Sequence, residues 1–307
     1  MTTRLARVGI VAKRGLRAAS DHLGALASWL RARGIEPMFD TETAALAGAG
    51  QQIASRSRDD LPNHVDLIVI MGGDGTLLSM ATRIAQNGRD IPILGVNFGS
   101  LGFLTETRID ELYTTLESAI EGRASFDERA MLAADAYRSR DLSLRSGEAA
   151  KAEHFDARIV LNDVVFTKAA LSRIIELSIT VSTGLVTKVK ADGLIIASAT
   201  GSTAYNLAAG GPIIHPRTDA VVITPIAPHT LTNRPIVIPS SEVVEVRPHV
   251  ELDADEIFVT YDGQAGYPLQ KGDVIKVRTS ERKLRLVKAP ARSYFEVLRE
   301  KLKWGER

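Results

Sequence analysis

A short apolar run in the first third of the chain ends abruptly in a glycine-rich turn. Residues 65–80 read VDLIVIMGGDGTLLSM, in which a mostly β-branched run stops at two consecutive glycines. Such a run is typical of a strand covered on both faces, as in a parallel sheet. Apolar residues then recur at helical spacing from Leu77, and Thr76 is a suitable N-cap. We therefore expect Asp74 at the carboxyl end of a strand, where open α/β sheets bind ligands.

Strand and helix patterns alternate elsewhere in this first third. Residues 7–13 and 91–97 have the composition of buried strands, and residues 19–34 have a helical pattern that ends at Gly34. Strands that alternate with helices indicate parallel βαβ units. The pattern predicts an α/β domain with a parallel sheet over residues 1–124.

From about residue 125 the pattern changes to many short strands between turn residues. In residues 173–182 (RIIELSITVS) apolar and polar side chains alternate, which is the period of a half-buried strand. Further runs of this kind are IVLNDVVF, LVTKVK, AVVITPI, PIVIP, EVVEVRP, IFVTYDG, DVIKVRT and LRLVK. They predict an all-β sandwich or barrel-like domain over residues 125–289. The polar residues 138–154 are expected to form a long exposed hairpin loop.

The last residues, 290–307, have an amphipathic helical pattern. Phe295, Leu298 and Leu302 fall on one helical face. We expect this helix to pack back on the first domain.

Composition limits the classes of function. The net charge of +1 over 307 residues gives no electrostatic case for nucleic acid or an anionic membrane as a partner. The absence of cysteine excludes disulfides, thiolate metal sites and cysteine nucleophiles. No apolar run approaches the roughly 18 residues that cross a bilayer, and the N-terminus lacks a secretory pattern. These features favour a cytoplasmic protein.

The glycine turn after the first apolar run has the features of a phosphate loop. Glycine lets a ligand approach the backbone closely, and peptide N–H groups at a helix start favour anions. The predicted loop consists of Gly72, Gly73, Gly75 and Thr76. Asp74 is unusual there, because a carboxylate repels phosphate unless a metal or a substrate hydroxyl lies between them. A lone Asp-Gly pair is usually only a turn, but strand, glycines, acid and helix together favour a ligand site.

Two further stretches are candidates for the same site. Gly95, Gly99 and Gly102 follow the next strand and predict either a shared crevice or ordinary tight turns. Residues 189–216 contain a buried strand, a hydroxyl-rich turn and one or two helical turns, on which Tyr205 either stacks on a base or packs in the core.

Asn162 and Asp163 interrupt the apolar run IVLNDVVF with two polar side chains. Because buried polar groups need partners, the interruption implies a ligand or a strand bulge.

Several common sites find no support. No GxGxxG follows a strand and no GxxxxGK[ST] occurs, so a conventional dinucleotide fingerprint and a P-loop are both unsupported. The six histidines show no metal-ligand spacing, and no protein metal site is predicted. Mg²⁺ held mainly by substrate phosphates is the expected arrangement.

The combined motifs resemble the bacterial NAD kinase family over nearly the whole chain. The stretches that carry the resemblance are GGDGT at 72–76, NFGSLGFLTE at 97–106, LND at 161–163, DGLIIASATGSTAY at 192–205, PIAPHTL at 225–231 and SYF at 293–295. GGDGT alone is shared with diacylglycerol and sphingosine kinases. This chain departs from the common family pattern in having Asn162-Asp163 for Asn-Glu and Ser198-Ala199 for Thr-Pro.

The resemblance implies a fold and a reaction. The fold is a Rossmann-like α/β domain, then a β-sandwich, with the C-terminal helix returning to the first domain. The reaction is transfer of phosphate from ATP, with a divalent metal, to the adenosine ribose 2′-hydroxyl of NAD⁺. Asp74 would accept the proton, and the protein would form a homodimer or homotetramer. The implied NAD-binding residues are Asp74, Gly75, Asn162, Asp163, Arg173, Lys190, Asp192, Thr203, Ala204, Tyr205, Asn206, Leu207, Ala208, Ala227 and Gln264.

Two alternatives come from different classes. A diacylglycerol-type lipid kinase would share the GGDGT loop, but it needs a membrane-facing surface that this near-neutral composition does not suggest. A non-catalytic NAD(H) sensor would bind the dinucleotide without turnover, yet it has no need of Asp74 beside a phosphate loop. The sequence leaves open ATP or polyphosphate as donor and NAD⁺ or NADH as acceptor.

Overall fold

The chain forms two compact units. The computed structural model describes residues 5–48, 53–99, 101–139, 152–169, 174–182, 184–230, 232–249, 257–288 and 292–304. Unit 1 comprises Met1–Glu128 and Leu284–Arg307, and unit 2 comprises Arg129–Lys283. Two strands, β7 (Phe126–Arg138) and β18 (Asp273–Val287), have residues in both units. Most of the predicted hairpin loop at 138–154 lies outside the described residues.

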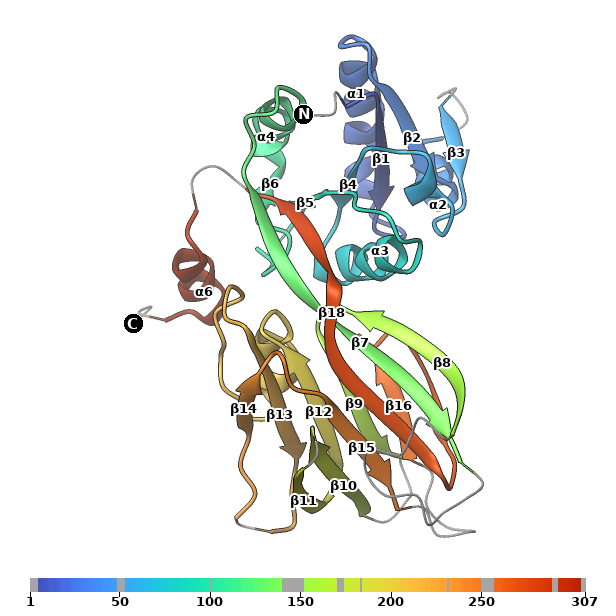
Figure 1. The fold of residues 1–307 in the computed structure, drawn as a ribbon. Helices are drawn as coiled ribbons and strands as arrows, with labels where there is room; N and C mark the ends of the chain where they lie inside the picture. Colours follow the sequence, from blue (N-terminus) through green and yellow to red (C-terminus); the bar gives the residue numbers. More distant parts are fainter. Residues whose placement is uncertain are drawn as a thin grey trace. The chain divides into compact units, whose positions relative to one another are not determined.

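Unit 1 is built on a parallel sheet in the order β3-β2-β1-β4-β5 (Figure 1). Its strands are β1 (Arg7–Ala12), β2 (Glu36–Asp40), β3 (Ala54–Arg56), β4 (Leu67–Met71) and β5 (Ile93–Asn97), with β6 (Thr107–Arg108) paired to β5. Leu286 of β18 adds a parallel pair with Ile93. The strands predicted from the sequence are confirmed within two residues at each end. The order reverses between β1 and β4, which is the switch point where such sheets bind ligands.

Helices cover both faces of this sheet. They are α1 (Ser20–Arg31), α2 (Thr41–Ala47), α3 (Asp74–Gln86) and α4 (Leu112–Ile120). Apolar residues of α1 and α4 share a buried cluster with Val8 and Ile10 of β1. Leu77 of α3 packs at the other face, where a Cβ at Gly95 would lie 2.8 Å from its Cδ1. Gly95 therefore lets α3 approach β5 closely.

The start of α3 corrects one expectation. Gly73, and not Thr76, is the N-cap, so the helix begins at Asp74. Gly73 is extended, and its carbonyl accepts the N–H groups of Thr76 and Leu77. Because a backbone carbonyl already starts the helix there, Asp74 lies in its first turn.

The C-terminal helix α6 (Tyr294–Leu302) belongs to unit 1, as expected. Its buried side chains are Val297 and Leu298, whereas Phe295 is 59% exposed. The predicted apolar face was thus wrong at Phe295, because a face centred on Val297 and Leu298 is the one that packs. A capping box formed by Ser293 starts the helix.

Unit 2 is a sandwich of two antiparallel sheets. The first has the order β11-β10-β15-β18, with β7 on β18 and β8 on β7, and the second has the order β14-β13-β12-β9-β16-β17. The bounds are β8 (Glu153–Val160), β9 (Asp163–Lys168), β10 (Ile175–Val181), β11 (Gly184–Ala191), β12 (Gly193–Ser198), β13 (Ala220–Ile226), β14 (Ile236–Pro239), β15 (Val244–Pro248), β16 (Ile257–Tyr261) and β17 (Ala265–Leu269). Two predicted strands, DVIKVRT and LRLVK, belong to the single strand β18.

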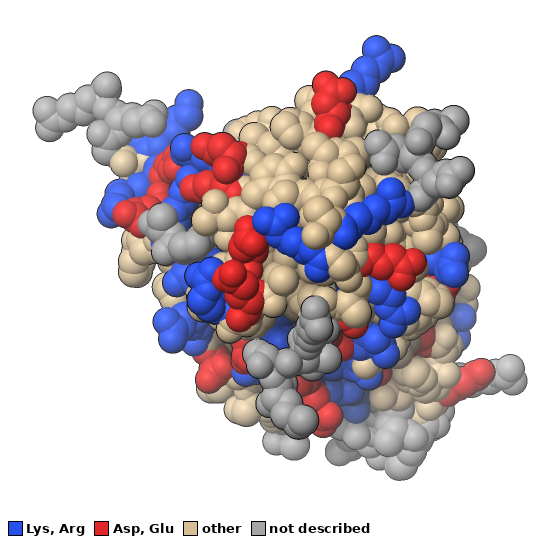
Figure 2. Space-filling model, turned by 90° about the horizontal axis from the view of Figure 1, so that it is seen from above, with Lys and Arg blue, Asp and Glu red and all other residues tan. Residues whose placement is uncertain are grey.

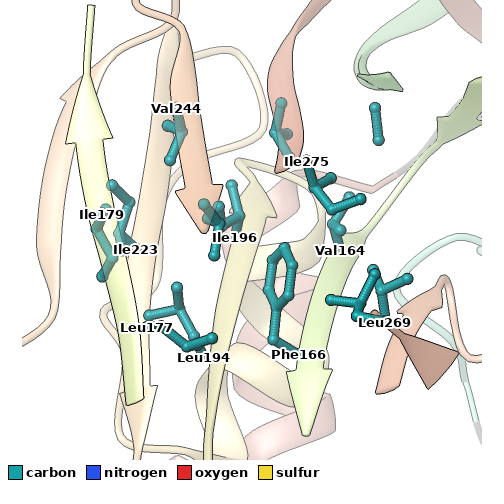
Figure 3. Packing of buried hydrophobic residues seen from close by; sticks show 14 of the residues in the cluster. Val164, Phe166, Leu177, Ile179, Leu194, Ile196, Ile223, Val244, Leu269 and Ile275 are labelled. Carbon is teal, nitrogen blue, oxygen red and sulfur yellow. The ribbon is translucent and has the colours of Figure 1, made fainter. Parts of the chain in front are cut away.

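Apolar side chains from both sheets fill the sandwich (Figure 3). Phe166 and Ile196 come from the second sheet and Ile179 and Val244 from the first. A smaller cluster lies on the outer face of the second sheet, where residues 209–214 contribute Ala209 and Ile214. The segment after β12 is therefore anchored on that face.

The run IVLNDVVF is not one strand. It divides into the end of β8 and the start of β9, with Leu161 and Asn162 between them and Asp163 as the first residue of β9. The two polar residues therefore lie at a break between strands.

On the face in Figure 2, Lys and Arg are interspersed with Asp and Glu. Within the described ranges, no helix is long and apolar enough to cross a membrane.

Candidate functional site

The glycine turn of unit 1 lies at the carboxyl end of β4. The N–H of Gly72 donates to the carbonyl of Val96 and that of Lys13 to the carbonyl of Met71, both at 2.9 Å. A Cβ at Gly72 would lie 2.9 Å from the Cβ of Lys13, so only glycine fits there. A Cβ at Gly73 or Gly75 would meet nothing within 4 Å. The turn is thus packed on one side and open to a ligand on the other.

The carboxylate of Asp74 is held by the turn that follows β5. Its Oδ2 accepts the N–H of Phe103 at 2.8 Å. Its Oδ1 accepts the N–H groups of Leu104 and Thr105 and the hydroxyl of Thr105, at 3.1, 3.0 and 2.9 Å. A Cβ at Gly102 would lie 2.0 Å from Oδ1, so this turn requires glycine as well. The two glycine turns meet at Asp74.

This arrangement leaves one carboxylate oxygen of Asp74 able to accept a further hydrogen bond. An ionised carboxylate has about four lone-pair sites and donates nothing. Oδ1 already has three donors and Oδ2 has one. A substrate hydroxyl can therefore donate to Oδ2 without displacing the turn.

A cavity of about 380 Å³ opens beside the carboxyl end of β5 in unit 1. Asn97, Phe98 and Leu101 line it, together with Arg108 and with Glu300 of α6. Its size is within the range of small-molecule sites.

Thr105, which the sequence did not single out, connects two polar residues of this region. Its hydroxyl accepts a hydrogen bond from the Asn97 side chain at 3.3 Å and donates to Asp74. Thr105 is fully buried. A threonine three residues after a turn glycine gives no sequence signal for this contact.

In unit 2, the break between β8 and β9 packs against the turn after β12. Ser198 donates its N–H to the carbonyl of Asn162 at 2.9 Å and its hydroxyl to that of Leu161 at 2.5 Å. A Cβ at Gly201 would lie 2.0 Å from the Asn162 carbonyl oxygen. Ser198, at a departure from the family pattern, therefore connects the two turns through a hydroxyl.

Asp163 is a buried acid at this junction. Its exposed fraction is 5%. Burial, and secondly the negative charge of Asp262, raise the pKa of Asp163 to about 7. Such a group is ready to accept hydrogen bonds from a ligand when ionised.

The hydroxyl-rich turn carries the helical turn α5 (Tyr205–Ala208). Tyr205 is 45% exposed, so its ring lies at the surface and not in the core. The Asn206 side chain is fully buried and bonded to Ser202, Pro212 and Thr224. Asn206 therefore holds the turn together through its side chain.

The turn also contains a hydroxyl without a partner. Thr200 Oγ1 is buried and, within the described part of the chain, makes no hydrogen bond. The Thr203 hydroxyl donates to the Thr200 carbonyl at 3.2 Å. Ala204, Leu207 and Ala208 complete the segment, with Ala208 exposed.

Lys190, Asp192 and Ala227 form a separate group. Asp192 donates its N–H to the carbonyl of Ile226, next to Ala227, and His229 donates to the Lys190 carbonyl. This group precedes the six-residue strand β12 and the hydroxyl-rich turn follows it, so the two lie roughly 20 Å apart. Gln264 lies instead in the turn of Asp262, beside Asn162 and Asp163. Arg173 lies outside the described residues.

The sequence matches two models of one protein family. Residues 8–124 match the ATP-NAD kinase N-terminal domain and residues 161–289 match the ATP-NAD kinase C-terminal domain. The chain belongs to the ATP-NAD kinase family. Among curated relatives, the NAD kinase of Syntrophotalea carbinolica is 46% identical over 305 residues, which is 98% of this chain and 99% of that protein. The NAD kinase of Geobacter sulfurreducens is 47% identical over 282 residues, covering 92% and 93%.

Solved structures show the same fold. Yeast NADH kinase complexed with NADH has a TM-score of 0.85 at 22% identity, covering 99% of this chain and 89% of that one. An NAD kinase from Archaeoglobus fulgidus in complex with ATP has a TM-score of 0.72 at 23% identity, covering 96% and 99%. Membership in the ATP-NAD kinase family makes this chain a phosphotransferase and sets aside the lipid kinase.

Proposed function

We propose that this chain transfers the γ-phosphoryl group of ATP to the adenosine ribose 2′-hydroxyl of NAD⁺, giving NADP⁺ and ADP. The observation that carries the proposal is Asp74, whose Oδ2 keeps an open acceptor site beside a glycine turn at the switch point of the sheet. Family membership supports the reaction.

In this proposal the glycine turn contacts both substrates, the phosphates of ATP and the 2′-hydroxyl of NAD⁺. The N–H groups of Gly73 and Gly75, with Gly72 and Thr76 completing the phosphate loop, face the donor phosphates at the start of α3. Asp74 Oδ2 accepts the hydrogen bond of the 2′-hydroxyl and takes its proton. Phosphoryl transfer depends mainly on positioning and charge stabilisation, because its transition state is loose. A carboxylate held in line with the transferred group is therefore sufficient.

The residues present do not provide a set of protein ligands for a divalent metal within the described ranges. In that part of the chain, no group of three histidine or acidic side chains is placed to hold a metal ion. The carboxylate of Asp74 already accepts four hydrogen bonds from the protein. We therefore propose Mg²⁺ that is held mainly by the donor phosphates. When bound, the metal would neutralise phosphate charge.

Unit 2 supplies the dinucleotide site in this proposal. Asn162 and Asp163 bind the adenosine portion, and the exposed ring of Tyr205 stacks on the base within the segment 203–208. Lys190, Asp192 and Ala227, together with Arg173 and Gln264, contact other parts of NAD⁺. We also propose a cytoplasmic homodimer or homotetramer, with the dinucleotide domain spanning residues 125–289.

A product assay tests the proposal. Purified protein is incubated with NAD⁺ or NADH and with ATP or polyphosphate, and product is detected by a dehydrogenase that accepts only NADP⁺ or NADPH. We expect NADP⁺ from NAD⁺ and ATP. A 2′-deoxyadenosine analogue of NAD⁺ should bind without being phosphorylated. Phosphate transfer to the analogue would contradict the proposed acceptor, and binding without any transfer to NAD⁺ would favour a sensor.

A further inference from the structure

The turn between β16 and β17 holds a buried carboxylate. Asp262 and Gly263 both have positive φ, 52° and 61°. An Asp-Gly pair in this conformation is an ordinary hairpin turn. However, Asp262 is only 7% exposed, and its side chain reaches the neighbouring break between β8 and β9.

Three consecutive backbone N–H groups donate to this carboxylate. Leu161 donates to Oδ2 at 2.8 Å, and Asn162 and Asp163 donate to Oδ1 at 2.7 and 3.0 Å. The N–H of Asp262 donates in return to the carbonyl of Asp163 at 3.0 Å. These N–H groups lie where the ladder is interrupted, and buried ones need an acceptor. Asp262 supplies it for the whole break.

We infer that Asp262 is a positioning residue for NAD⁺ binding. By fixing the backbone of residues 161–163 it sets the directions in which the Asn162 and Asp163 side chains leave the chain. It also carries Gln264 on the same turn. The inference rests on the proposed function, because it assumes that Asn162 and Asp163 bind NAD⁺.

The charge of Asp262 has a second effect. It adds to burial in raising the pKa of Asp163 to about 7, while the residue paired with Asp163 on β12, Ala197, is uncharged. Asp163 accepts hydrogen bonds from ribose hydroxyls at both oxygens only when ionised. The affinity for NAD⁺ should therefore decrease as the pH falls through about 7.

Two substitutions separate charge from hydrogen bonding. Asp262→Asn keeps the turn, because asparagine tolerates positive φ, and keeps an acceptor for Asn162 and Asp163. It removes the charge and the acceptor of the Leu161 N–H. Asp262→Gly also keeps the turn but removes every acceptor. The measurements are the Kd for NAD⁺ by calorimetry and the KM for NAD⁺ and for ATP, from pH 5.5 to 8.5, with thermal midpoints.

We expect a different pattern for each variant. In Asp262→Asn the pH at which NAD⁺ affinity declines moves below that of the wild type. In Asp262→Gly the Kd for NAD⁺ rises about tenfold or more at every pH, while the KM for ATP changes less than about threefold.

Asp273 provides a matched control. It is another buried carboxylate of unit 2, which accepts the N–H of Gln270 at 2.8 Å and pairs with Arg138. Asp273→Asn should lower the thermal midpoint but leave the Kd for NAD⁺ and its pH dependence as in the wild type.

The inference is overturned if Asp262→Asn leaves the pH dependence unchanged, or if Asp262→Gly binds NAD⁺ like the wild type. Should the glycine variant fail to fold, the pH dependence in the asparagine variant decides alone. Calorimetry needs no turnover, so a wild type that binds NAD⁺ but makes no NADP⁺ would reject the proposed function and still test this inference.

Discussion

The hydroxyl of Thr105 and the backbone N–H of the same residue both donate to Oδ1 of Asp74, at 2.9 and 3.0 Å. Thr105→Val keeps the N–H and the shape but removes the hydroxyl. We expect kcat to fall about tenfold with little change in KM for NAD⁺, because Asp74 loses one of four donors and is held less firmly. Steady-state kinetics with saturating ATP measures both constants.

Thr115 is the control for this substitution. It lies on α4 with 1% exposure, and its hydroxyl has no partner among the described residues. Thr115→Val should therefore leave kcat unchanged and keep or raise the thermal midpoint. Equal kcat values for the two valine variants would show that Thr105 does not position Asp74.

Asp163→Ala should weaken binding of NAD⁺ selectively. The loss of a charge-assisted hydrogen bond costs about 1.5–3 kcal/mol, which is a rise of about 10- to 150-fold in KM for NAD⁺. The KM for ATP should change much less. If the variant instead unfolds without ligand and keeps its KM for NAD⁺, Asp163 is a structural strand residue.

The stability of the ligand-free protein should depend on pH through the same residue. The pKa of Asp163 is raised from 3.8 to about 7, so between these values the folded protein holds a proton that the unfolded chain has released. Its contribution to stability is therefore complete below about pH 4 and is lost as the pH rises through about 7. Asp163→Asn, which cannot ionise, should raise the thermal midpoint relative to wild type more at pH 8 than at pH 5. The same difference at both pH values would contradict this.

Removal of divalent metal should abolish turnover without unfolding the protein. Excess chelator is expected to stop NADP⁺ formation and added Mg²⁺ to restore it, because no other cation is proposed for the donor phosphates. The thermal midpoint without substrates should not move, since the metal is held mainly by ATP. Full turnover in excess chelator would refute the metal proposal.

The sequence was sufficient for most of the fold. Buried β-branched runs located β1, β4 and β5, and short apolar runs located most strands of unit 2. The strands β2, β3, β7 and β17 were not among those predicted. The prediction of the buried face of α6 failed, because that face depends on the residues that pack against the helix. Phe295 lies outside the buried face of α6, because helical spacing alone cannot choose between overlapping apolar faces.

The site was visible only where its residues belong to motifs. Asp74 and the 161–163 stretch have such signals, but the sequence placed Asn162 and Asp163 within a strand and not at a break. Thr105 and Asp262 contact these residues from turns 31 and 100 positions away along the chain. Pairings of that range arise from tertiary packing, and Asp262-Gly263 in isolation predicts only a turn.

The most direct test compares Asp74→Asn with Asp66→Asn. Asp74 follows β4, and Asp66 directly precedes it. Asp66 also accepts two backbone N–H groups, those of Ala6 and Arg7. Asparagine at 74 can keep the bonds at Oδ1, but its NH₂ group replaces Oδ2, which accepts the N–H of Phe103 and, in the proposal, the 2′-hydroxyl. We predict that Asp74→Asn folds and loses about 10²- to 10⁴-fold in kcat, the usual scale for a positioned acid or base, while Asp66→Asn keeps kcat. A kcat for Asp74→Asn within a few-fold of the wild type would show that Asp74 only holds a turn.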